Sequence, residues 1–150
     1  MKLDRDIISF FESQGCVVFS TIDDKGYPHS SCKGIVKIDE AGEVALLDAY
    51  YGRTYLNLQN NQLASITAFN EHKFKGYCLK GKARLAKDRE VGADIIKAWD
   101  KRISGRLAQR LLKNIREDKA GKRHPEAKLP KPKHLILFKV NEIVDLAPGS

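Results

Sequence analysis

Cysteines are few in this chain of 150 residues, and long apolar segments are missing. The three cysteines, Cys16, Cys32 and Cys78, stand in none of the paired spacings of disulfide frameworks or zinc sites. An odd number of separated cysteines is typical of a reducing compartment, so we predict a cytoplasmic location. The start MKLDRDIISFFESQG is charged, and no later segment approaches the roughly 20 apolar residues of a membrane span. We therefore expect neither a secreted nor a transmembrane protein.

Several signatures of catalysis and ligand binding are also missing. No histidine has a second histidine at HxxxH spacing or a cysteine at metal-ligand spacing, so a metal site is not expected. The glycines form neither a phosphate loop nor a GxGxxG motif. The nucleophiles in the segment SSC at 30–32 have no evident base in the sequence. Metalloenzymes, P-loop proteins and hydrolases with a covalent intermediate thus receive little support.

The net charge of +8 is concentrated in one segment. Residues 101–134 contain 12 Lys and Arg against 3 Asp and Glu, whereas the rest of the chain has 15 against 16. Such a segment is most often a solvated helix and loop. The alternative is an anionic partner, and a small nucleic-acid-binding barrel that uses this segment is one hypothesis for the protein.

Expected strands outnumber expected helices along the chain, which predicts a mainly β protein. Segments rich in β-branched and aromatic residues predict strands at 16–22, 29–39, 43–52, 63–71, 73–86 and 134–146. A helical period predicts helices at 3–14, at 53–61, from Asp88 to about Trp99, and from 106 to about 116. We expect one domain over 1–150, a small antiparallel barrel with flanking helices and a basic insertion at about 101–134, because closure hides strand edges.

Polar residues interrupt the second and third expected strands and begin the helix that follows. They are Ser30, Ser31, Lys33, Asp48, Tyr50, Tyr51, Gly52, Arg53 and Thr54. Gly52 permits close backbone approach, and Arg53 and Thr54 begin a helix whose free N–H groups favour an anion such as phosphate. A surface arginine, a capping threonine and core tyrosines would explain the same residues, and on the residues alone that explanation is the commoner case.

The segment from Gly15 to about Ala86 resembles the FMN-binding split barrels related to pyridoxamine 5′-phosphate oxidase. The resemblance rests on the order of the elements and on GCVVFSTIDDKGYPHSSCKGIVKI, YYGRTYLNLQNNQLASITAF and GYCLKGKARL. It covers roughly half of the chain, and it implies a small split β-barrel that binds FMN as an oxidoreductase or electron carrier. Relatives that bind haem or a deazaflavin instead are the alternative within the same fold.

The resemblance also implies which residues hold the cofactor. The family's phosphate-binding pair maps onto Arg53 and Thr54, beside Tyr51 and Gly52. The isoalloxazine ring would be lined by Ser31, Cys32 and Lys33, and the third-strand wall would be completed by Asp48 and Ala49. No catalytic acid or base is implied.

Two further expectations follow from the family. Its members usually form homodimers with each flavin at the subunit boundary. Tyr50, Tyr51 and Trp99 are aromatic residues expected to be exposed near it, and core packing is the alternative explanation for all three. Pyridoxamine phosphate oxidation is not expected, because Ser31 stands where those oxidases carry an arginine and the C-terminal substrate motif is missing from HLILFKVNEIVDLAPGS.

Overall fold

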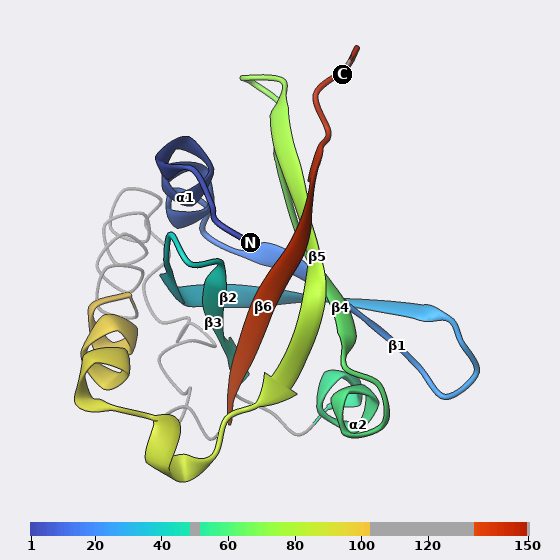
Figure 1. Ribbon diagram of the computed structural model, residues 1–150, viewed down its shortest axis with the longest axis vertical. Coiled ribbons are helices and arrows are strands. Elements are labelled where there is room, and N and C mark those ends of the chain that lie inside the picture. The colour runs from blue at the N-terminus through green and yellow to red at the C-terminus, as the bar shows by residue number, and fades with distance from the viewer. Residues whose placement is uncertain (49–51, 103–133, 150) are drawn as a thin grey trace, which may run out of the picture.

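Six antiparallel strands close into a barrel in the order β1-β2-β3-β6-β5-β4 in the computed structural model, which describes residues 1–48, 52–102 and 134–149 (Figure 1). The strands are β1 (Val17–Ile22), β2 (Pro28–Ile38), β3 (Glu43–Asp48), β4 (Leu63–Asn70), β5 (Lys75–Leu85) and β6 (His134–Asp145). The helices are α1 (Arg5–Glu12), α2 (Arg53–Asn60), the short 3-10 helix η1 (Asp88–Glu90) and a helix over residues 93–102. The predicted mainly β architecture with flanking helices is confirmed.

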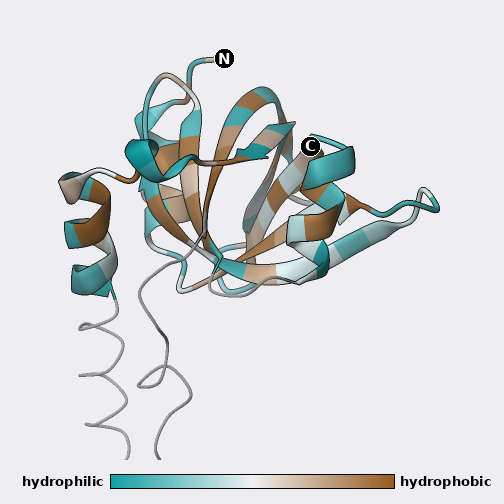
Figure 2. Ribbon diagram, turned by 90° about the horizontal axis from the view of Figure 1, so that it is seen from below, coloured by the Kyte–Doolittle hydropathy of each residue, from teal (hydrophilic) through white to brown (hydrophobic). Residues whose placement is uncertain are grey.

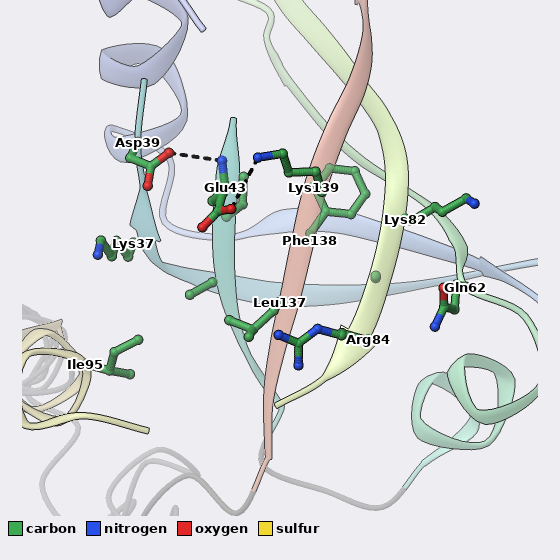
Figure 3. Close-up of a pocket in the computed structure, with 13 residues that line it drawn as sticks. Lys37, Asp39, Glu43, Gln62, Lys82, Arg84, Ile95, Leu137, Phe138 and Lys139 are labelled. Carbon is green, nitrogen blue, oxygen red and sulfur yellow. Dashed lines mark hydrogen bonds and ion pairs between the residues drawn. The ribbon is translucent and has the colours of Figure 1, made fainter. Parts of the chain in front are cut away.

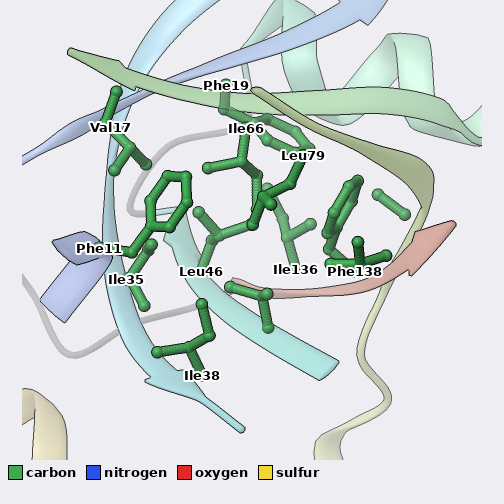
Figure 4. Packing of buried hydrophobic residues seen from close by; sticks show 14 of the residues in the cluster. Phe11, Val17, Phe19, Ile35, Ile38, Leu46, Ile66, Leu79, Ile136 and Phe138 are labelled. Atoms are coloured by element: carbon green, nitrogen blue, oxygen red, sulfur yellow. The ribbon is translucent and has the colours of Figure 1, made fainter. Parts of the chain in front are cut away.

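The barrel interior is filled by alternate residues of every strand. Along β1 the side chains of Val17, Phe19 and Thr21 are buried and those between them are more exposed, as the strand period of two requires. Apolar and polar bands accordingly alternate along the strands in Figure 2. The largest interior side chains, several of them drawn in Figure 4, are Phe11, Phe19, Leu46, Ile66, Leu79, Ile136 and Phe138.

Two of the helices pack near different ends of β1. In α1 the ring of Phe10 lies edge-on to Tyr77, with the centroids 5.3 Å apart, and Phe11 is fully buried. In α2 the residues Thr54, Asn57 and Leu58 are buried, a spacing that places them on one face of the helix. α2 contacts β1, β5 and β2. Its Asn57 donates a hydrogen bond to Thr21, near the C-terminal end of β1.

The helix over 93–102 covers part of the outer surface of the barrel. Its Ile95 belongs to a small apolar cluster with Ala45 and Leu135. The guanidinium of Arg102 donates hydrogen bonds to the backbone carbonyls of Ile35 and of residues 14 and 15, the latter two at 3.0 and 2.9 Å. These contacts attach the helix to β2 and to the loop between α1 and β1.

Two expectations about this helix are wrong. It was expected to begin at Asp88, but the chain forms η1 over Asp88–Glu90 and the helix begins at residue 93. The carboxylate of Glu90 is held by Arg84 and by the amide of Lys87, which keeps this turn apart from the helix. Trp99 was expected to be exposed, but only 7% of its surface is accessible.

The expected helix at 106–116 and Tyr50 lie outside the described residues. Within the part of the chain that the structure describes, no helix is both long and apolar enough to cross a membrane.

Candidate functional site

A polar layer interrupts the apolar interior of the barrel next to α2. Ser31 lies opposite Phe19 and Lys33 lies opposite Val17 in the β1–β2 ladder, so both occupy inward positions. Asp48 at the end of β3 is 2% exposed. Ile35 of β2 and Val44 and Leu46 of β3 are buried apolar residues of the same interior, so these polar side chains need partners of their own.

Lys33 and Asp48 form a largely buried ion pair. The Lys33 Nζ donates to Asp48 Oδ1 at 2.9 Å, and the two side chains are 14% and 2% exposed. The second carboxylate oxygen, Asp48 Oδ2, is buried and has no hydrogen-bond partner within the described residues. An unpartnered buried acceptor costs free energy, so this oxygen is suited to a donor that a ligand supplies.

Side-chain hydroxyl and amide groups connect strands β1 and β2 to α2. Ser31 and Thr54 share a hydrogen bond between their hydroxyl oxygens at 3.1 Å, and Thr54 is 3% exposed. Asn57 donates from Nδ2 to the hydroxyl oxygen of Thr21 at 3.0 Å, and both residues are buried. The start of α2 is therefore held against β1 and β2 by side chains that have defined partners.

The first turn of α2 has the properties of an anion site. Gly52 is the N-cap residue and has no side chain to accept from the N–H groups of the first turn. Arg53 is the first helical residue and is exposed, and no acidic residue lies in this turn. Free N–H groups, the positive end of the helix dipole and a guanidinium thus meet at one place.

Cys32 lies on the opposite face of β2, because successive side chains of a strand alternate. It is exposed and belongs to an uncharged row across the outer sheet surface. The row consists, in ladder order, of Cys32, Val18, Thr67, Cys78 and Val144. Next to this row lies a groove of about 440 Å³, whose lining includes Ser20, Leu63, Ser65 and Cys78. Ser20 shares a hydrogen bond with Ser30, at 2.9 Å, on the strand that carries Cys32.

The residues predicted from the sequence therefore fall into three groups. Ser31, Lys33, Asp48 and Thr54 come together inside the barrel beneath α2, while Gly52 and Arg53 are exposed at the start of that helix. Cys32 faces the outer sheet surface, and Ala49 and Tyr51 lie outside the described residues.

Thr21 and Asn57 belong to the same polar layer and were not predicted from the sequence. A signal existed, since Asn57 shares the helical face of Thr54 and Leu58, and Thr21 continues the inward alternation of Val17 and Phe19. Over residues 1–48, 52–102 and 134–149, no three His, Cys, Asp or Glu side chains lie close enough to hold a metal ion.

The chain matches one known protein family. The family described as pyridoxamine 5′-phosphate oxidase matches residues 3–146 of the chain. No curated protein matches the sequence of this chain.

Three solved structures illustrate the likeness of fold. HupZ of Group A Streptococcus is 17% identical, with a TM-score of 0.65, and the match covers 99% of this chain and 98% of HupZ. HutZ of Vibrio cholerae, described as a heme storage protein, is 17% identical with a TM-score of 0.55 and coverages of 96% and 94%. An F420 reductase is 13% identical with a TM-score of 0.56 and coverages of 91% and 94%. At these identities the likeness shows the shared fold alone.

Proposed function

Because the chain belongs to the pyridoxamine 5′-phosphate oxidase family, we propose that it binds FMN and acts as a flavin-dependent oxidoreductase or electron carrier. The observation that carries the proposal is the start of α2, where exposed Arg53 adjoins Gly52 and an uncapped first turn. A phosphate dianion suits these groups, since a guanidinium and backbone N–H groups make charge-assisted hydrogen bonds to phosphate oxygens.

The polar layer beneath α2 suits the rest of the cofactor. FMN has hydroxyl groups on its ribityl chain and an imide N–H on its ring, and these are donors for the buried oxygen Asp48 Oδ2. The hydroxyl of Thr54, at the start of α2, lies beside that of Ser31 on β2. The phosphate proposed at α2 would therefore be close to the part of the cofactor that lies along β2. Ser31, Cys32 and Lys33 would line the ring through their backbone groups.

The chain's own part in the reaction is to bind and orient. FMN, when bound, supplies the capacity to accept and return electrons. The chain contributes the anion site at Arg53, the acceptor at Asp48 and an ammonium on Lys33 whose position is fixed by its ion pair. The electron donor and acceptor would meet the cofactor from outside the barrel.

A pair of arginine variants tests the phosphate site. Arg53→Ala is expected to weaken FMN binding by about 1.5 to 3 kcal/mol, or roughly tenfold to hundredfold, the range for hydrogen bonds to a charged group. Arg5→Ala is the matched control, because Arg5 is likewise the exposed first residue of an eight-residue helix. Its FMN affinity should equal that of the wild type in the same calorimetric titration.

Riboflavin separates the phosphate from the ring. It lacks the phosphate, so it should bind the wild type weakly and lose little further affinity in Arg53→Ala. Equal losses for FMN and riboflavin would mean that Arg53 does not bind the phosphate, and the assignment of this helix would be withdrawn.

The proposed cofactor also has two alternatives in the family's range, haem and an F420-type deazaflavin. Similar solved structures include a heme storage protein and an F420 reductase. Competition titrations of the purified protein with FMN, hemin and F420 rank the three. Tighter binding of hemin or F420 than of FMN would replace FMN in the proposal.

We propose further that the protein forms a homodimer through the uncharged outer row. Outward sheet positions are usually polar in a solvated face, yet this row has no charge and its Val18 is 41% exposed. Phe69, 48% exposed, lies on the same outer face of β4 as Thr67. Such a face is typical of an interface between subunits.

Sedimentation of two charge variants at micromolar concentration tests the dimer. Thr67→Lys places a charge in the middle of the row and should shift the protein toward the monomer. Lys97→Glu, an exposed change on the outer helix, is the control and should leave the assembly unchanged. A wild type that sediments as a monomer while binding FMN tightly would contradict a shared interface.

A further inference from the structure

The buried pair of Thr21 and Asn57 is a polar contact at a position that suits apolar side chains. Thr21 is 2% exposed and follows the apolar Val17 and Phe19 along the inward face of β1. Asn57 is 9% exposed and donates from Nδ2 to the Thr21 hydroxyl oxygen at 3.0 Å. Two apolar side chains of the same shape would stabilise the fold about equally well, since the hydrogen bond mainly offsets the desolvation of the two polar groups.

What the hydrogen bond adds to this contact is direction. Apolar burial is non-directional, so it holds a helix against a sheet without fixing its rotation. An N–H···O bond weakens steeply when its donor and acceptor are misaligned. Asn57 lies three residues after Thr54 on the same buried face of α2. Its bond to β1 therefore fixes the direction in which the first turn of α2 faces.

The two ends of α2 are attached in different ways. Beyond its C-terminal end, the backbone N–H of Ala83 in β5 donates at 2.7 Å to the carbonyl oxygen of Gln62, the residue that leads from α2 into β4 (Figure 3). At its start, the hydroxyl groups of Thr54 and Ser31 share a hydrogen bond of 3.1 Å. The N-cap residue Gly52 has no side chain to fix the first turn. Side chains on the buried face of α2 therefore hold its N-terminal end.

This end of α2 is the proposed phosphate site, so the inference rests on the proposed binding of FMN. The N–H groups of a helix start and a guanidinium bind phosphate through charge-assisted hydrogen bonds of about 2.7 to 2.9 Å. A shift of about 0.5 Å or a rotation of about 10 to 20° weakens such a site. Thr21 and Asn57 are buried on the barrel side of α2, so they do not contact the phosphate themselves.

We propose that Thr21 and Asn57 are positioning residues for the phosphate site. They act through α2, because the hydrogen bond between them orients the helix so that its first turn and Arg53 face the cofactor phosphate beside β2. The pair thereby sets the preference for a phosphorylated flavin over riboflavin, and it contributes little to the affinity for the ring.

Replacing the pair by apolar side chains of the same shape tests this role. Thr21→Val together with Asn57→Leu keeps the branching of both side chains and leaves neither polar group without its partner. Such a double replacement is close to neutral for stability, so the urea midpoint should stay near that of the wild type. In calorimetric titrations FMN should bind roughly tenfold more weakly, the lower end for a lost hydrogen bond to a charged group, and riboflavin within about twofold of the wild type.

Two control variants should keep the wild-type ratio of FMN affinity to riboflavin affinity. Thr21→Ser is the conservative change, because it keeps the hydroxyl that accepts from Asn57. Asn60→Leu makes the same substitution as Asn57→Leu on the same helix. Asn60 is exposed, and its amide donates to the carbonyl oxygen of Leu56 within α2 at 3.3 Å.

The outcomes separate the positioning role from the proposal of FMN binding. A wild type that binds FMN no more tightly than riboflavin removes the phosphate site and the positioning role together. A wild type that prefers FMN, with a double variant that has the same preference or loses both flavins equally, overturns the positioning role alone. If the double variant does not fold, Thr21→Val by itself carries the same expectation, since Asn57 then lacks its acceptor on β1.

Discussion

Removing one partner of the Lys33–Asp48 pair should destabilise the protein strongly. Among the described residues, the lysine ammonium is the side-chain donor to Asp48, and Asp48 is 2% exposed. Lys33→Met keeps the length of the side chain but leaves a buried carboxylate without a counter-charge. Asp48→Leu has the converse effect, leaving an ammonium on a side chain that is 14% exposed.

The size of the effect follows from the burial of the pair. Breaking a buried ion pair costs roughly 3 to 5 kcal/mol, whereas an exposed pair costs about 0 to 1 kcal/mol. Lys33→Met should fall in the upper range because Asp48 has almost no access to water. Asp48→Leu should cost less, about 2 to 3 kcal/mol, because the Lys33 ammonium retains some contact with solvent. The double variant should lose less than the sum of the two, since neither charge is then left alone.

Urea unfolding followed by the fluorescence of the single tryptophan, Trp99, measures these losses. With a denaturant dependence of about 2 kcal/mol per molar urea, a loss of 4 kcal/mol lowers the midpoint by about 2 M. Single-variant losses below about 1 kcal/mol that add in the double variant would refute the reasoning, because the pair would then behave as a solvated surface pair.

Three further changes have expected outcomes. Glu90 has a folded-state pKa of about 2, below its unfolded value, so its contribution to stability is present above about pH 4.5 and is lost as the pH falls toward 2. NMR titration of the Glu90 carboxyl, in the wild type and in Arg84→Gln, checks this pKa. Gly81→Ala should cost on the order of 3 kcal/mol in urea unfolding, because its Cβ would collide with backbone of β6, whereas Gly15→Ala, with open space around it, should change stability by less than about 0.5 kcal/mol. Arg102→Met removes donors to three backbone carbonyls and should lower the free energy of unfolding by about 3 kcal/mol, and an unchanged urea midpoint would contradict this role.

Local patterns predict those features that depend on neighbouring residues. The β-branched and aromatic residues at 16–22 predict the strand β1, and the helical period that begins at Arg53 predicts α2. The pairing of strands β1 with β2 and β2 with β3 follows from short turns. The match of the chain to its family over 3–146 confirms the resemblance.

Features that depend on distant residues could not be predicted. The partners of Arg102 lie 67 to 88 residues away in the sequence, and nothing local identifies them. The start of the outer helix was misplaced because Arg84, four residues before Asp88, holds Glu90 in a separate turn. Likewise, alternation in β2 separates Cys32 from Ser31, although the two are adjacent in the motif.

The proposal of FMN binding is tested most directly by the absorbance spectrum of the purified protein after equilibration with FMN and removal of free ligand by gel filtration. We predict the two bands of a bound flavin in the visible and near-ultraviolet regions, retained by the wild type and by Arg5→Ala and largely lost from Arg53→Ala. A protein that elutes colourless after equilibration with excess FMN would contradict the account.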